Sequence, residues 1–160
     1  MTNSNRTSCN SCNSNDDKPS CTCPINFGSF FNTIAQSAGP TGDITFNNPG
    51  PFKGIRQTPP GSAVITIDKD GTYQATYEIS SAILVGGSAT PFQFALFLNG
   101  SEVAGSRYNG STGDVPNVGQ VMFVAAEGDL LTLKVNIAGL VLTAPTNAST
   151  NASLIINRVK

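Results

Sequence analysis

The sequence predicts an all-β fold, an antiparallel jelly-roll sandwich that follows a flexible N-terminal extension. Three observations support this class. Short runs of alternating apolar and polar residues recur along the chain, and turn dipeptides rich in Gly, Asn and Asp separate them. No apolar stripe with a period of 3.6 residues reaches helical length. Many short strands at close spacing are typical of sandwiches and jelly rolls.

Composition divides the chain near residue 25. Residues 1–24 hold all four cysteines, many Ser and Asn, and almost no apolar side chains. Such a segment cannot bury enough apolar surface to offset the entropy lost on ordering. We therefore expect a flexible, cysteine-rich connector over 1–24 and a jelly-roll head over 25–160.

Within the head, three runs show the period of two that half-buried antiparallel strands require. Their inward stripes are expected to be Tyr73, Ala75, Tyr77 and Ile79, then Ala63, Ile65 and Ile67, then Leu131, Leu133 and Val135. A hairpin is expected where Asn99-Gly100 joins Phe92–Leu98 to Ser101–Ser106, because Asn-Gly favours tight hairpin turns. Further turns are expected at Asp70-Gly71, Gly86-Gly87, Asn109-Gly110 and Gly128-Asp129.

Some strands are apolar on both faces, namely Phe92–Leu98, Val118–Ala125 and Leu154–Val159. A sandwich normally exposes one face of each sheet to water. The second apolar face predicts either a covering loop or a subunit interface, which resembles a domain core cut in half. We expect an interface that includes Phe97, Phe123 and Ile155.

Charge is scarce in this chain. Only 12% of its residues are charged and the net charge is −1, a composition that favours self-association. We expect no nucleic-acid partner, because a basic footprint is missing, and no membrane partner, because there is neither a polybasic patch nor an apolar run of spanning length. The N-terminus lacks an apolar signal-peptide core, so an external protein is expected to leave by lysis of a mother cell.

The residue types argue against catalysis. The chain has no histidine, which removes the commonest general base and most zinc enzyme sites. Carboxylates come together locally only at Asp68-Lys69-Asp70 and Glu127-Gly128-Asp129, both at predicted turns. We interpret them as turn caps, and a calcium site is the alternative. We expect no enzyme activity, no catalytic residue and no cofactor.

The cysteines form a C-x-x-C and a C-x-C pair, Cys9 with Cys12 and Cys21 with Cys23. No cysteine lies in the head, so none of them can cross-link it internally. We expect intermolecular disulfides at all four positions. A zinc site of four thiolates, a redox pair, which would need a strand-to-helix context, and free thiols are the alternatives.

Four motifs in order resemble a known family. Asp70–Tyr77, with Gly71, Tyr73 and Tyr77, resembles a strand of C1q/TNF-like jelly rolls, and Phe94–Ser106 resembles their F-A-L-x-L-N-G hairpin. Ala125–Leu133 carries their G-D-x-L-x-L strand, and Asn151–Val159 their N-A-S-L-x-I-x-R terminus. Together, over about residues 27–160, they are most similar to the C-terminal head of the Bacillus collagen-like exosporium glycoproteins.

This resemblance implies a homotrimeric jelly-roll head on a spore surface. The long Gly-X-Y stalk of those glycoproteins is replaced here by the short cysteine-rich segment, which looks more like the connector of a thin endospore appendage. We therefore expect trimeric heads joined head-to-tail into a fibre, with an anchor protein on the spore surface as a further partner. The residues expected at the connector contact are Ile25, Phe27, Phe30 and Phe31. The alternative function is an adhesive tip domain that binds a glycan or a receptor.

Overall fold

The computed structural model describes residues 25–38, 41–80, 82–84, 91–113, 115–136, 140–143 and 149–160. These residues form fourteen strands and no helix, so the described chain has no helix able to cross a membrane. The predicted connector over 1–24, its cysteines and the predicted Gly86-Gly87 turn lie outside the described residues. The strands are β1 Phe27–Asn32, β2 Gln36–Ser37, β3 Asn48–Lys53, β4 Ile55–Gln57, β5 Ile65–Ile67, β6 Gly71–Ile79, β7 Ala82–Leu84, β8 Phe92–Leu98, β9 Ser101–Glu102, β10 Tyr108–Gly110, β11 Asn117–Ala125, β12 Leu130–Val135, β13 Leu140–Leu142 and β14 Ala152–Arg158.

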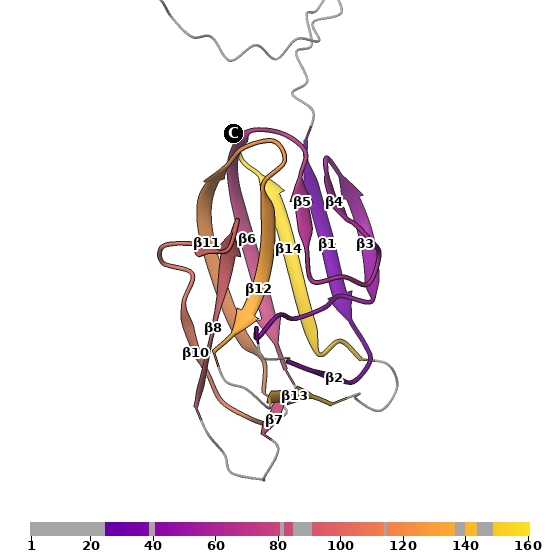
Figure 1. Ribbon diagram of the computed structural model, residues 1–160, viewed down its shortest axis with the longest axis vertical. Coiled ribbons are helices and arrows are strands. Elements are labelled where there is room, and N and C mark those ends of the chain that lie inside the picture. The colour runs from indigo at the N-terminus through magenta and orange to yellow at the C-terminus, as the bar shows by residue number, and fades with distance from the viewer. Residues whose placement is uncertain are drawn as a thin grey trace, which may run out of the picture.

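Two antiparallel sheets face one another (Figure 1). One has five strands in the order β11-β6-β14-β1-β3. The other follows the order β10-β8-β12-β5-β4, with β9 paired to β8. A small third sheet, β2-β13-β7, lies at one end of the sandwich. Most neighbours in the two large sheets, such as β6 and β14 or β12 and β5, are distant in sequence, which is the interleaved topology of a jelly roll.

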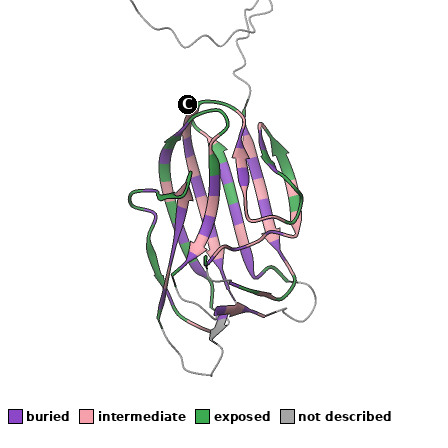
Figure 2. Cartoon of the chain, in the orientation of Figure 1, coloured by how far each residue is buried: buried purple, intermediate pink, exposed green. Residues whose placement is uncertain are grey.

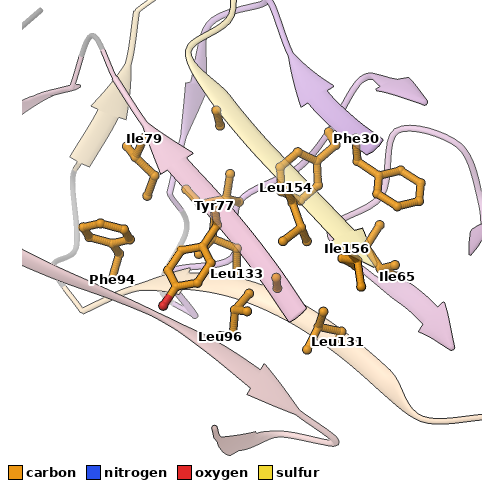
Figure 3. Close-up of a cluster of buried hydrophobic side chains, with 14 of the residues drawn as sticks. Phe30, Ile65, Tyr77, Ile79, Phe94, Leu96, Leu131, Leu133, Leu154 and Ile156 are labelled. Carbon is orange, nitrogen blue, oxygen red and sulfur yellow. The ribbon is translucent and has the colours of Figure 1, made fainter. Parts of the chain in front are cut away.

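The core lies between the two large sheets and is built from the predicted alternation. Along β6, Tyr73, Ala75, Tyr77 and Ile79 are all fully buried, while the residues between them are half-buried. Tyr77 and Ile79 share one core cluster with Leu131 and Leu133 of β12 and Ile65 of β5 from the opposite sheet (Figure 3). The stripes predicted in all three runs are therefore confirmed, except that Ala63 is only half-buried and precedes β5.

The Asn99-Gly100 turn forms as expected. Both residues have positive φ, 51° and 80°, which is the conformation that Asn and Gly tolerate in a two-residue hairpin turn. The Asn99 side chain also fixes the turn to β12, because its Oδ1 accepts from Leu130 N at 2.9 Å.

The Asn109-Gly110 turn was predicted wrongly. These residues lie inside β10, where Gly110 packs so tightly on Phe92 that an added Cβ would lie 2.5 Å from the ring.

The two ends of the sandwich differ in what they carry. At one end β1 begins beside the C-terminus (Figure 1), and main-chain bonds join Arg158 N to Asn26 O at 2.8 Å and Thr72 N to Lys160 O at 2.8 Å. We call this the N-terminal end. At the other end lies the small sheet. Beside it, the buried Asn32 side chain donates to Asn151 Oδ1 at 2.8 Å. We call this the far end.

Candidate subunit interface

The outer face of the five-stranded sheet exposes apolar side chains. Along β11, exposed residues alternate with buried ones (Figure 2), and Met122 and Val124 are 59% and 74% exposed. Ile155 on β14 is exposed by 45%. A monomeric sandwich gains nothing from apolar groups in water, and exposed apolar side chains gathered on one face of a sheet are a mark of a candidate interaction site. We define the candidate interface as the outward residues Val118, Met122, Val124 and Ile155, with Phe27 and Phe31 beside them.

Strand register places these residues on one continuous surface. Met122 lies opposite Gln74, Gln74 opposite Asn157, and Asn157 opposite Phe27, so one row of side chains crosses four strands. Apart from Ile155 and Glu78, the outward residues of β6 and β14 are Thr, Gln, Ser and Asn, and Glu78 is the one charged residue among the outward positions of β1, β6, β11 and β14. A surface with so little charge is inexpensive to desolvate, as the core of a subunit interface requires.

The structure does not bring the three predicted interface residues together. Ile155 lies in the candidate interface. Phe97 projects from β8 on the outside of the other sheet, where Lys134 Nζ lies 5.4 Å from its ring centroid. Phe123 points inward, is only 8% exposed and stacks on Tyr73 with ring centroids 5.9 Å apart. Phe123 is therefore a core residue of one subunit. Its neighbours Met122 and Val124 face outward instead and belong to the candidate interface.

Truncating Phe123 should test this placement by its effect on stability. Phe123→Ala is expected to lower the free energy of unfolding by about 3–5 kcal/mol, the usual cost of removing a buried phenylalanine ring. The matched control, Phe97→Ala, removes a half-buried ring and should cost much less. Urea denaturation followed by circular dichroism measures both. Equal losses for the two variants would contradict the inward placement of Phe123.

The four residues expected at the connector contact do not lie on one surface either. Phe30 is fully buried in the core against Leu154, its partner in β14, so it is not available to a neighbouring molecule. Ile25 is 68% exposed at the N-terminal end. Phe27 and Phe31 point outward from β1 and are half-buried. The alternation of β1 explains this division, because Phe30 has opposite parity to Phe27 and Phe31.

A shallow depression lies on the outside of the six-stranded sheet. Its lining consists of Asp43, Ala63, Val64, Asn99, Gly100, Leu130, Thr132 and Lys134. The Lys134 Nζ to Asp43 Oδ1 distance is 2.9 Å. The described lining includes an acid and an amide but no aromatic ring. Sugar recognition commonly uses an aromatic face, so this depression gives little support to a glycan site.

The turn carboxylates act as caps. Asp70 Oδ1 accepts from Glu127 N at 2.7 Å, and Asp129 Oδ2 accepts from Ala126 N at 2.8 Å. Asp129 Oδ1 accepts from the Asn99 side chain at 2.8 Å. These bonds use the oxygens that a cation would need. Among the residues that the structure describes, no three acids gather as ligands for a metal ion.

The perturbed titratable groups are structural. Burial raises the pKa of Tyr77, whose hydroxyl donates to the Ser106 carbonyl inside the core. Burial likewise raises the pKa of Tyr73, whose hydroxyl donates to Lys69 O at 2.6 Å. On the surface, a hydrogen bond from Arg107 lowers the pKa of Glu102. The same hydrogen bond raises the pKa of Arg107, which forms an ion pair with Glu102, so the pair keeps both charges rather than preparing a general acid or base.

Comparison with known proteins agrees with this architecture. The sequence model of one protein family, described as the BclA C-terminal domain, matches residues 29–160. No curated protein sequence gives a significant match.

Similar solved structures include murine APRIL at pH 5.0, with 13% identity, a TM-score of 0.59 and coverage of 85% of this chain and 100% of that one. Murine APRIL at pH 8.5 gives 11% identity and a TM-score of 0.60 over the same shares. Pika GITRL gives 13% and 0.50, covering 84% of this chain and 96% of its own. At these identities the likeness establishes the fold alone, and it confirms the predicted C1q/TNF-like jelly roll.

Proposed function

The chain belongs to the BclA C-terminal domain family, the C-terminal domains of collagen-like exosporium proteins, and from that membership we propose that it is a structural subunit of a fibre on the spore surface. Domains of this family and of the TNF-like fold act as structural or ligand domains rather than enzymes. The absence of histidine from the chain agrees with a structural role.

The observation that carries the proposal is the candidate interface. It presents exposed apolar residues from β11 and β14 on a surface with a single acid, Glu78. A second copy of the same chain is the occupant that fits, because a low-charge, apolar patch is typical of permanent contacts between identical subunits. We propose that three heads associate through this face into a homotrimer.

The segment 1–24 then joins trimers into a fibre. It precedes Ile25, which lies exposed at the N-terminal end of the head. If the segment of one trimer docks on the next, the contact is head-to-tail and does not close, so it propagates as a filament. The head contains no cysteine, so a disulfide between subunits of the fibre would have to join one such segment to another.

An adhesive tip domain is the second candidate function, and the depression beside Asp43 and Lys134 is the place where such a ligand would bind. The exposed apolar residues of β11 support a trimer under either function, so polymerisation separates the two. A tip domain would bind its ligand as an isolated trimer and would not polymerise.

Immunogold electron microscopy of intact spores tests the proposal. Antibodies raised against the purified chain are expected to label thin fibres at the spore surface along their length. Spores that lack the gene provide the control and should lose both the label and the fibres. Label confined to fibre tips would favour the adhesive function, and label beneath the outer spore layers would contradict both.

A further inference from the structure

Charge is distributed unequally between the two ends of the head. The N-terminal end carries the ion pair of Lys69 with Glu127, at 3.2 Å, and the pair of Arg56 with Asp68. Three long stretches of the sequence have no charged residue at all, namely 25–42, 79–101 and 135–157. Parts of all three meet at the far end, where β2, β7 and β13 pair into the small sheet (Figure 1).

The described residues of the far end are uncharged and partly apolar. None of residues 33–38, 82–84, 140–143 and 149–151 is charged. The nearest acids in the sequence are Glu78, four residues before Ala82, and Asp43, five residues after Ala38. Ile34 is 53% exposed there, although its carbonyl is held by the side chains of Asn32 and Asn151 at 2.5 and 2.9 Å. An exposed apolar side chain on a fixed backbone suits a docking surface, because little entropy is lost when it is covered.

The small sheet also has an open edge at the far end. Among the described strands, β2 pairs with β13 alone, and Ala38 N donates to Leu140 O at 2.9 Å. In an antiparallel pair, the N–H and C=O groups of successive residues point alternately toward and away from the partner strand. Since Ala38 bonds to β13, the N–H and C=O of Ser37 point away from it. The Gln36 side chain fixes the strand, since its Oε1 accepts from Thr45 N at 2.8 Å. An open, fixed edge can accept an added strand.

The longer edge strand β3 contrasts with β2. It carries Pro49 and Pro51, which have no N–H group to donate and so resist strand addition. The edge strand β11 belongs to the candidate interface and would be covered in a trimer. β7, the other edge of the small sheet, is bridged to Gly113 at Ala82, so among the described residues β2 is the edge of that sheet without a second main-chain partner.

We infer that the far end, around Ile34 and the edge of β2, is the acceptor for residues 1–24 of the neighbouring trimer. This rests on the fibre function proposed above. The donor segment leaves its own head at the opposite end, as head-to-tail growth requires. Its composition matches the surface, since it is dominated by Ser, Asn and Thr and its four charged residues sum to zero. Fully extended, 24 residues span about 80 Å, whereas the nine-residue strand β6 spans about 30 Å, so the segment is long enough to cross the junction.

Ile34→Lys in the full-length chain tests the acceptor, because it places a charge on the docking surface without touching the candidate interface. The matched control is Leu130→Lys, which charges a residue of similar exposure, 45%, on the outside of the other sheet. We expect Ile34→Lys to form trimers by light scattering but no fibres in negative-stain micrographs. Leu130→Lys should form fibres of wild-type length. If Ile34→Lys disturbs the trimer, Ser37→Pro replaces it, because proline has no N–H to donate at the open edge and adds no charge.

Mixing distinguishes the acceptor from the donor. Ile34→Lys chains keep an intact N-terminal segment, so they can dock on a wild-type fibre but cannot receive the next trimer. One variant trimer in ten is therefore expected to shorten wild-type fibres to about ten trimers on average, whereas Leu130→Lys should have no effect. Ile34→Lys fibres of wild-type length would overturn the acceptor while leaving the fibre function intact. A wild-type chain that forms no fibres would overturn both.

Discussion

Removal of residues 1–24 is expected to abolish fibres and leave soluble trimers. All described strands lie within residues 27–158, so the truncated chain of residues 25–160 keeps both sheets and the core between them. It also keeps the candidate interface, while it loses the donor segment of the head-to-tail contact. Negative-stain microscopy should show isolated particles, and light scattering should give the mass of three chains.

The control for the truncation is a full-length chain in which Cys9, Cys12, Cys21 and Cys23 are all replaced by Ser. Docking depends on the segment itself, whereas disulfide cross-linking depends on its thiols. This variant should therefore still form fibres, but these fibres should dissociate at a lower temperature or denaturant concentration. Long fibres from the truncated chain would show that residues 1–24 are not the connector, and the adhesive-tip function would then become the better account.

Charging the candidate interface is expected to convert trimers into monomers. In the chain of residues 25–160, Met122→Lys and Ile155→Lys together would bury two unpaired ammonium groups per subunit. Each unpaired buried charge costs several kcal/mol, and each 1.4 kcal/mol changes an association constant about tenfold. In the monomer both side chains face water, so the thermal stability of the individual head should change little. Analytical ultracentrifugation at micromolar concentration measures the outcome.

The matched variant is Leu130→Lys in the same truncated chain. Leu130 and Ile155 have the same exposed fraction, 45%, but lie on different sheets. The comparison therefore shows whether a lysine disrupts the trimer because of where it lies or simply because it adds a charge. Leu130→Lys should remain trimeric. A trimer that survives both lysines at positions 122 and 155 would place the subunit contact on another surface.

Local pattern was sufficient to predict the fold class and much of the core. The alternation of Tyr73, Ala75 and Tyr77 depends only on the period of a strand, and the Asn99-Gly100 turn only on the conformations that these two residues tolerate. Both are properties of neighbouring residues, so a single sequence contains them. The Asn109-Gly110 pair shows the limit, because there close packing of Gly110 on Phe92 decided the conformation.

The candidate interface was harder to predict, because β11 is apolar on both faces. The sequence placed Val118, Met122 and Val124 on one side and Phe123 on the other, but not which side meets the core. The choice depends on β6, where Tyr73 stacks on Phe123 from the neighbouring strand. The position of the far end was likewise hidden, since it depends on which distant segments pair into the small sheet.

Cryo-electron microscopy of fibres assembled from the purified full-length chain tests the central claim most directly. The account predicts a repeat with threefold symmetry, in which Met122 and Ile155 are buried between heads of one trimer and residues 1–24 continue into the next. Fibres in which the outer face of the five-stranded sheet is exposed to solvent, or repeats without three subunits, would contradict it.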